Sequence, residues 1–454
     1  MLIRGTAGSG KTTLMKEAVA AVERGGHRVF TFAPSADASR GVLRGEGFAT
    51  ADTVARLLVD TKLQAETRGQ VLWIDEAGLL GSKAMRQVFD LAGRLDCRVI
   101  LSGDRKQHGA VERGAVLKVL ETQAGLPVAE VREIQRQHGA YKDAVALLAD
   151  GRTEDGFDRL DALGWVKEVP TTERYQQLAD DYVAAVGEGK TALVVSPTHA
   201  EGAKVTAAVR TTLRTAGTLS GDDHALSALT RVDLTEAQRG VATNYRAGDV
   251  LQFHQNAKGF KAGDRLTVTE GSAIPVEQAG RFQVFRPADL RVAVGDRLRI
   301  TKGGQSKDGH KLENGSVYAV RGFTTSGDVR LANGWVVGRD FGHLAHGYVT
   351  TSHASQGKTV DRVFIGQSGE SWGAASKEQF YVSASRGRQS VTVYTDDKLA
   401  LREAIGRTED RPAAVELVQS RQHLHRQRVR LHRAVPRTRQ SDHRDRPRRE
   451  VSRD

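Results

Sequence analysis

Short apolar runs alternate with segments of helical spacing through the first 135 residues of the chain. The runs at Val29–Phe32, Val71–Ile74 and Val99–Ser102 have the length and the β-branched or aromatic content of buried strands. Strands that alternate with helices in this way are typical of a parallel sheet covered by helices. The pattern therefore predicts an α/β domain at the start of the chain.

A second series of the same kind begins at Ala192–Val195, after helical spacing between about residues 141 and 185. Strand and helix alternation returns at Val363–Ile365 and Val391–Tyr394, and it closes before about Arg407. These stretches are predicted to form one second α/β unit, although a long segment of another kind separates them.

That segment, between about residues 245 and 343, consists of short alternating runs punctuated by glycine. Asp249–Phe253 and Ser316–Val320 are two such runs, and the second follows Asn314-Gly315, a dipeptide that favours tight hairpin turns. We interpret the segment as a small β-barrel or sheet inserted into the second unit.

The net charge is less informative than its size suggests. The chain has 67 basic and 55 acidic residues, a net charge of +12. Thirteen arginines and five acidic residues between Arg411 and Asp454 supply +8 of it, so the rest of the chain is close to balance. We expect a basic, disordered tail that adheres to polyanions, and any polyanion site elsewhere depends on local residues.

Composition excludes several classes of protein. The chain is 39% apolar and 27% charged, as is usual for a globular protein, and no apolar run approaches the length needed to span a membrane. The single cysteine, Cys97, excludes an internal disulfide and a cysteine-based metal cluster. We expect a soluble, cytoplasmic protein.

A phosphate-binding pattern follows the first strand. The residues are Gly5, Thr6, Ala7, Gly8, Ser9, Gly10, Lys11 and Thr12, and a helical run begins at Thr13, the last candidate nucleotide-binding residue of this stretch. The glycines allow the tight turn that brings backbone N–H groups around phosphate oxygens. Lys11 is expected to neutralise the β and γ phosphates of ATP, and Thr12 to ligate Mg²⁺. Chance lettering in a glycine-rich turn is the alternative, but the strand before it and the helix after it favour nucleotide binding.

Two adjacent carboxylates, Asp75 and Glu76, end the second apolar run. Such pairs are common on solvated faces and are weak evidence alone. After a P-loop and at the end of a buried strand, however, they occupy the position where Asp75 would hold Mg²⁺ and Glu76 would accept a proton from the attacking water.

Three further polar residues are candidates for the same chemistry. Gln107 follows the next strand, where it is expected to sense the γ-phosphate or orient water; the alternative is that it belongs to a surface turn with no role in the site. Arg136 and Arg386 are candidates for neutralising the charge that develops in phosphoryl transfer, whereas an isolated arginine is usually solvated.

In this order, the motifs resemble a superfamily 1 helicase of the RecD-like branch, and more closely the helicase part of MobF-type conjugative relaxases. The resemblance extends from residue 1 to about residue 406. Besides the P-loop, the stretches that carry it are Ala33–Ala36, Thr53–Leu58, Asp75–Gly78, Gly103–His108, Ile134–Gln137, Ser196–Glu201, Leu234–Gln238, Thr350–Gly357 and Tyr381–Arg386.

The resemblance implies two RecA-like motor domains with ATP in the cleft between them and single-stranded DNA across both. In such a protein Arg386 of the second domain reaches the γ-phosphate held by Lys11 of the first, so that hydrolysis opens and closes the cleft. The predicted division is residues 1–137 for the first motor domain, 138–247 and 345–408 for the second, 248–344 for the inserted β-barrel, and 409–454 for the disordered tail.

The resemblance also assigns contacts to the remaining motifs. Gly357 joins the nucleotide-binding set. For His353, a capping or core role is the alternative, and its neighbours Ser355 and Gln356 favour a site role. The residues that match the DNA-contacting motifs of the family are Pro34, Ser35, Thr53, Pro197, Thr198, Thr351, His353 and Gln356.

Two departures from the family pattern limit what can be carried over. The chain begins four residues before Gly5, where relatives have a segment that reads adenine, and it has no upstream relaxase domain. We therefore predict no DNA nicking or transesterification by this chain. Its start and its basic tail suggest a fragment, or an end in unrelated sequence.

The leading hypothesis is an ATP- and Mg²⁺-dependent DNA helicase or translocase, with 5′ to 3′ movement implied by the resemblance alone. We expect a monomer whose partners are single-stranded DNA and a relaxase or the conjugation machinery. The alternatives are a non-catalytic nucleic-acid-binding remnant of such a helicase, and a P-loop ATPase switch that does not translocate.

Overall fold

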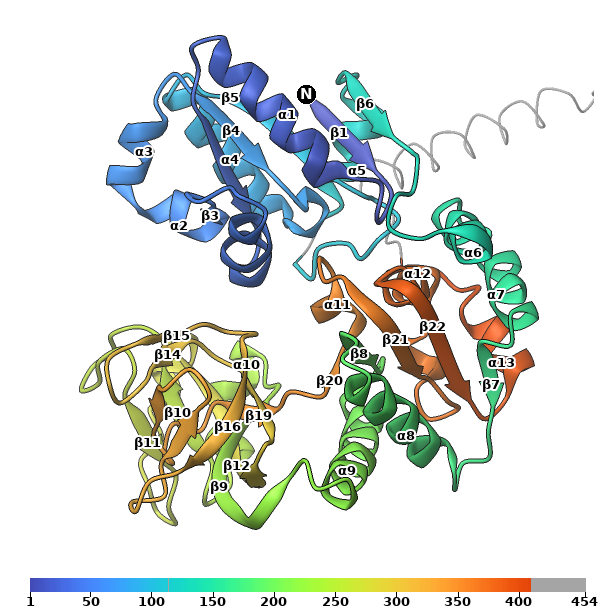
Figure 1. The fold of residues 1–454 in the computed structure, drawn as a ribbon. Helices are drawn as coiled ribbons and strands as arrows, with labels where there is room; N and C mark the ends of the chain where they lie inside the picture. Colours follow the sequence, from blue (N-terminus) through green and yellow to red (C-terminus); the bar gives the residue numbers. More distant parts are fainter. Residues whose placement is uncertain (113, 410–454) are drawn as a thin grey trace, which may run out of the picture. The chain divides into compact units, whose positions relative to one another are not determined.

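Six parallel strands form the first sheet in a computed structural model that describes residues 1–112 and 114–409. Their order is β3-β2-β4-β5-β1-β6 (Figure 1). β2 and β4 are buried along their whole length, which explains why their sequences are apolar throughout rather than alternating. The strands are β1 (Leu2–Gly5), β2 (Val29–Ala33), β3 (Asp52–Thr53), β4 (Val71–Ile74), β5 (Arg98–Gly103) and β6 (Val128–Val131).

Helices connect these strands and supply the rest of the first core. In α4 the buried residues Met85, Val88, Leu91 and Ala92 recur at helical spacing and pack against β4 and β5 residues in one cluster. The helical elements are α1 (Lys11–Arg24), the π-helical η1 (Asp37–Leu43), α2 (Val54–Val59), α3 (Thr61–Thr67), the short 3₁₀ turn η2 (Ala77–Leu79), α4 (Ser82–Arg94) and α5 (Val116–Gln123).

A second parallel sheet has the order β20-β8-β21-β22-β7 (Figure 1). Its strands come from both sides of the insertion, so the prediction that the two stretches share one α/β unit is confirmed for the sheet. The strands are β7 (Val166–Glu168), β8 (Ala192–Val195), β20 (Val349–Thr350), β21 (Val360–Gly366) and β22 (Gly387–Thr395).

The prediction of unbroken helical spacing from residue 141 to 185 is wrong at β7. This strand has only three residues, too few for a period of two to be recognised among its helical neighbours. The helical elements around the second sheet are α6 (Gly139–Ala149), α7 (Thr153–Ala162), α8 (Arg174–Gly187), α9 (His199–Thr215), α11 (Ser352–Ser355), η5 (Trp372–Ala374), α12 (Lys377–Ala384) and α13 (Lys398–Ala404).

The segment between these two stretches is antiparallel β structure, as its alternating pattern predicts. It contains a four-stranded sheet, β11-β10-β12-β9, and a five-stranded sheet, β18-β17-β16-β13-β19. It begins with β9, ahead of the predicted start at residue 248. Its elements are β9 (Ser220–Val232), α10 (Glu236–Arg239), η3 (Ala242–Asn244), β10 (Val250–Phe253), β11 (Arg265–Thr267), η4 (Val276–Arg281), β12 (Phe282–Val294), β13 (Arg297–Ile300), β14 (Gly304–Gln305), β15 (Lys311–Leu312), β16 (Val317–Phe323), β17 (Val329–Leu331), β18 (Val336–Val337) and β19 (Leu344–His346).

Residues 1–409 form one compact unit, and the predicted disordered tail lies outside the described residues apart from its first position. Within the described ranges, no helix combines the length and the apolar character that crossing a membrane requires. Closure of the antiparallel sheets into a barrel stays a prediction, as do the domain boundaries.

A buried carboxylate ties the insertion to α9. Asp296, between β12 and β13, accepts two hydrogen bonds from Arg210 of α9, at 3.0 and 2.9 Å, and one from the Tyr348 hydroxyl at 2.8 Å. The Ala293 N–H donates to it as well, at 2.7 Å. Burial raises the pKa of Asp296, but these donors, with the charge of Arg210, lower it below its ordinary value.

We expect Asp296→Ala to reduce the free energy of unfolding by about 3 kcal/mol, because it leaves the largely buried Arg210 without its main partner. Urea denaturation followed by circular dichroism measures this loss. Asp90→Ala is the control: it removes an ion pair with Arg86 on the exposed face of α4 and should change stability by less than about 0.5 kcal/mol. Equal losses in both variants would contradict the importance of the buried carboxylate.

Candidate functional site

The P-loop makes a tight turn between β1 and α1. Gly8 and Gly10 have φ angles of 75° and 82°, in the left-handed region that favours glycine. A Cβ atom at Gly5 would lie 2.5 Å from Lys11 Cγ, so only glycine leaves room for the lysine side chain. Lys11 Nζ donates to the carbonyl oxygens of Gly5 and Thr6, at 2.6 and 3.3 Å. The loop therefore has the shape of a phosphate cradle with its cation in place.

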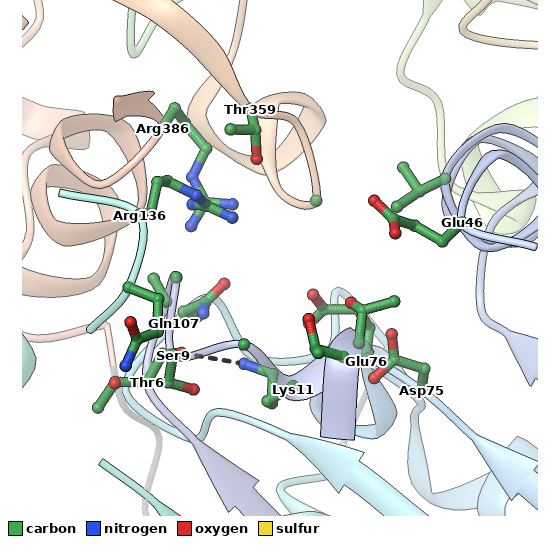
Figure 2. Close-up of a pocket in the computed structure, with 18 of the residues that line it drawn as sticks. Thr6, Ser9, Lys11, Glu46, Asp75, Glu76, Gln107, Arg136, Thr359 and Arg386 are labelled. Carbon is green, nitrogen blue, oxygen red and sulfur yellow. Dashed lines mark hydrogen bonds between the residues drawn. The ribbon is translucent and has the colours of Figure 1, made fainter. Parts of the chain in front are cut away.

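A cavity of about 520 Å³ opens over this loop. Residues of the first sheet and of the second line it together, as Figure 2 shows for ten labelled side chains. The predicted residues among those that line it are Thr6, Ala7, Gly8, Ser9, Gly10, Lys11, Thr12, Thr13, Asp75, Glu76, Gln107, Arg136, Gly357 and Arg386. The structure thus gathers the predicted nucleotide and catalytic residues, apart from Gly5, around one space.

Asp75 and Glu76 lie where β4 ends at this cavity. The indole N–H of Trp73 donates to Ser102 Oγ at 2.8 Å, and the Ser102 hydroxyl donates to Asp75 Oδ1 at 2.6 Å. Burial, with the charge of Glu76, raises the pKa of Asp75 to about 6. Two neighbouring carboxylates in such a place favour a divalent cation, and carboxylate and hydroxyl oxygens are the ligands that Mg²⁺ prefers. Asp75 and Thr12 therefore fit the predicted metal site.

Arg136 and Arg386 approach the cavity from opposite parts of the chain and point into the same region of it (Figure 2). Arg386 is buried and donates to the Val382 carbonyl and to Ser385 Oγ, both at 2.8 Å. Arg136 donates to the Ser385 carbonyl at 2.8 Å. Burial, and then the charge of Arg386, lower the pKa of Arg136 to about 9, and burial lowers that of Arg386. The two guanidinium groups therefore face a shared space in which an anion would stabilise both.

Tyr381, on α12, joins the two halves of the site in a way that the sequence did not predict. Its buried hydroxyl accepts from the Ala7 N–H of the P-loop at 2.7 Å and donates to Asp104 Oδ2 at 2.9 Å. Gln107 Nε2 donates to the same Asp104 oxygen at 3.2 Å, while its Oε1 is buried and makes no hydrogen bond. The free amide oxygen of Gln107 is thus positioned by a network that includes Tyr381 of α12.

Three of the predicted DNA-contacting residues lie together at the carboxyl edge of the first sheet. Pro34 and Ser35 follow β2, and Thr53 ends β3, which pairs with β2 in parallel. Ser35 Oγ accepts from the Ala38 N–H at 3.1 Å, and Thr53 Oγ1 accepts from the Arg56 N–H at 3.1 Å. Both hydroxyls therefore have local capping partners.

The second sheet has a corresponding group. Pro197 and Thr198 follow β8, and Thr351 follows β20, its parallel neighbour. Thr198 caps α9 and Thr351 caps α11, through the backbone N–H groups of Glu201 and Ala354. The parallel register places these residues side by side at one edge.

His353 stacks on His108, at 3.4 Å between ring centroids. His108 Nε2 lies 2.8 Å from Ser352 Oγ, and its Nδ1 lies 3.5 Å from a carboxylate oxygen of Glu409. The nitrogen lone pairs of stacked rings lie in parallel planes and do not converge on one point. This arrangement is unfavourable for the two histidines to ligate the same metal ion. The pair instead fastens α11 to the loop after β5.

Gln356 is the predicted DNA-contacting residue whose side chain the structure places elsewhere. Its Nε2 donates to Glu76 Oε2 at 3.0 Å, so it contacts the predicted general base. Sequence reasoning also missed Glu46 and Thr359, which line the cavity (Figure 2). Neither lies in a recognisable motif for phosphate chemistry, and only the fold brings them there.

Comparison with known proteins agrees with this geometry. The family model described as an AAA domain matches residues 1–171. The probable conjugal transfer protein TraA of Sinorhizobium fredii (strain NBRC 101917 / NGR234) is 27% identical over 399 residues, which cover 86% of this chain and 30% of TraA. The multifunctional conjugation protein TraI of Escherichia coli (strain K12) is 25% identical over 476 residues, 89% of this chain and 27% of TraI. Most of this chain is therefore similar to part of each of these conjugation proteins.

The predicted resemblance to proteins of conjugative DNA transfer is thereby confirmed. The chain spans less than a third of the length of these curated relatives. A solved structure described as DNA unwinding at forked dsDNA by two coordinating Pif1 helicases shares the fold, with a TM-score of 0.51 and 14% identity over 94% of this chain and 93% of that one.

The His108–His353 stack predicts a dependence of stability on pH. Burial, and then the charge of His108, lower the pKa of His353 to about 4, although Glu409 opposes this. The folded state favours neutral His353. The contribution of this residue to the free energy of unfolding is therefore complete above the ordinary pKa of about 6.5 and is lost as the pH falls toward 4. The melting temperature should therefore be a few degrees lower at about pH 5 than at about pH 7.5. In His353→Phe, which keeps a stacked ring, this difference should be smaller. The same drop in both proteins would contradict this.

Proposed function

We propose that the chain is an ATP-dependent DNA helicase or translocase that moves 5′ to 3′ on single-stranded DNA during conjugative DNA transfer. The observation that carries this proposal is that Lys11, at the start of α1, and Arg386, just before β22, line the same cavity. A nucleotide held there contacts both sheets, so that its hydrolysis changes the attraction between them. The relationship to TraA and TraI supports the conjugative role, and the 5′ to 3′ direction comes from the resemblance of the motifs alone.

Each group of residues around the cavity has its own proposed role in ATP hydrolysis. Backbone N–H groups of the P-loop and Lys11 bind the phosphates, and Glu76 accepts the proton of the attacking water. Gln107 orients that water through its free amide oxygen. Thr12 and Asp75 would hold Mg²⁺, which when bound neutralises charge on the β and γ phosphates.

Arg136 and Arg386 stabilise the charge that develops on the transferred phosphoryl group. Both already face the cavity. Burial lowers the pKa of each, and the charge of Arg386 further lowers that of Arg136, so holding these cations there has a cost. A γ-phosphate reduces that cost, and its departure restores it. We propose that this difference drives the opening and closing of the cleft.

The two edges described above provide a path for the strand. Pro34, Ser35 and Thr53 would hold its backbone on the first sheet, while Pro197, Thr198 and Thr351 would hold it on the second. We propose that His353 contributes from its exposed face, and that the antiparallel sheets, β9 included, close into a small barrel beside the strand. Residues 1–137 would then be one motor domain, and residues 138–247 with 345–408, apart from β9, would be the other. A relaxase is the proposed partner, because strand cleavage needs chemistry that we do not assign to this chain.

Lys11→Ala should abolish ATP hydrolysis stimulated by single-stranded DNA, because the β and γ phosphates lose their main cation. Phosphate release measured with and without an unstructured oligonucleotide tests this. Lys83→Ala, on the exposed side of α4, is the matched control and should hydrolyse ATP normally. Unchanged turnover in Lys11→Ala would refute the site, and turnover in the unaltered protein that ignores DNA would indicate a switch ATPase.

Direction of movement needs a separate experiment. A duplex with a 5′ single-stranded extension should be unwound in the presence of ATP, and the same duplex with a 3′ extension should not, because loading precedes movement toward the junction. Strand displacement measured by fluorescence distinguishes the two substrates. Preference for the 3′ extension would overturn the proposed polarity, and binding without ATP turnover would indicate a non-catalytic remnant.

A further inference from the structure

We propose that Gln356 is a positioning residue that orients the general base Glu76, so that hydrolysis depends on where α11 lies. The inference rests on the proposed function and concerns the same site. Gln356 Nε2 donates a hydrogen bond to Glu76 Oε2 at 3.0 Å, and this contact joins residues that are 280 positions apart.

The backbone of Glu76 already restricts where its carboxylate can lie. Glu76 has φ 51° and ψ 38°, and only one other non-glycine residue in the described ranges, Asp96, has a positive φ. A glutamate in this left-handed conformation is unusual, and such strain is commonly retained at functional positions. This backbone conformation sets the direction of the Cα–Cβ bond of Glu76. The side chain can still rotate about its own bonds, so its carboxylate is fixed only if another group holds it.

Gln356 is suited to be that partner because it is neutral. A lysine or arginine in its place would form an ion pair with the carboxylate and make Glu76 a weaker base, whereas an amide donates one hydrogen bond and adds no charge. The bond occupies Oε2 and leaves Oε1 to accept a proton from water. The Gln356 Oε1 atom is buried and has no hydrogen-bond partner, so the amide has one polar contact in the described structure, and it is with Glu76.

The position of Gln356 in the chain gives the contact its consequence. Gln356 directly follows α11, which begins after Thr351 and contains His353. Both Thr351 and His353 belong to the proposed strand-binding edge. Gly357 follows with φ 84° and lines the nucleotide cavity. One segment of seven residues, 351–357, therefore reaches from the proposed strand path to the general base.

The same segment is fastened to the loop after β5 by the stacking of His353 on His108 and by the His108–Ser352 hydrogen bond. Glu76 is therefore oriented only while α11 rests against the first sheet's loops. A strand that holds α11 in that place promotes hydrolysis, and a cleft that opens withdraws the amide from the base. Gln356 in this way makes proton acceptance conditional on closure.

The test compares Gln356→Ala with Gln389→Ala, an exposed glutamine on β22. We expect Gln356→Ala to lower the kcat of DNA-stimulated ATP hydrolysis by about 10- to 100-fold, with the KM for ATP and the Kd for a fluorescent oligonucleotide nearly unchanged. Gln356→Glu should be at least as damaging, because it sets a second carboxylate against Glu76. Gln389→Ala should match the unaltered protein in all three measurements.

A double-mutant cycle separates positioning from a general loss of structure. In the Glu76→Gln background, Gln356→Ala should cause no further loss of the residual turnover, because the group that it orients is already gone. An additive loss would overturn the proposal, as would an unchanged kcat accompanied by weaker oligonucleotide binding, or faster turnover without DNA. If the unaltered protein hydrolyses no ATP, the proposed function itself fails, and this result is distinct from normal turnover in Gln356→Ala.

Discussion

The mutual repulsion of two buried cations is the constraint on which the site depends. Arg136 and Arg386 face one cavity, and burial lowers the pKa of each below its ordinary value. Proteins tolerate such an arrangement when an anion or a network of acceptors compensates it. Here the backbone carbonyls of Ser385 and Val382 and the hydroxyl of Ser385 compensate only in part. In the proposed function a polyphosphate would supply the missing compensation, so the attraction between the two sheets would depend on what the cavity contains.

The sequence predicted the parts of this arrangement that lie within short stretches. The P-loop is one continuous pattern between a strand and a helix, and Asp75 and Glu76 directly follow a buried strand. Parallel strands place their carboxyl ends at one edge, so residues after β1, β4 and β5 had to meet. The grouping of Pro34 with Thr53, and of Thr198 with Thr351, follows from the same rule once the strand order is known.

Other features depend on contacts that no local pattern contains. β7 is too short to interrupt helical spacing visibly. Tyr381 bridges Ala7 and Asp104 only because α12 approaches the P-loop, and Gln356 reaches Glu76 across 280 positions. A glutamine beside a DNA-contacting motif is as compatible with a phosphate as with a carboxylate, and the fold alone decides between them. The sequence did predict antiparallel structure in the insertion, but not that it begins as early as β9.

The two hydrogen bonds that link Trp73 through Ser102 to Asp75 have a consequence of another kind. An indole N–H, a hydroxyl and a carboxylate are joined by two successive hydrogen bonds, and the indole is almost completely buried. Hydrogen bonds in series polarise one another, so a cation that draws electrons from Asp75 also changes the electrostatic environment of the ring. Indole emission is sensitive to that environment. Trp73, one of four tryptophans in the chain, would therefore be an intrinsic optical reporter of a cation bound at Asp75, without any attached dye.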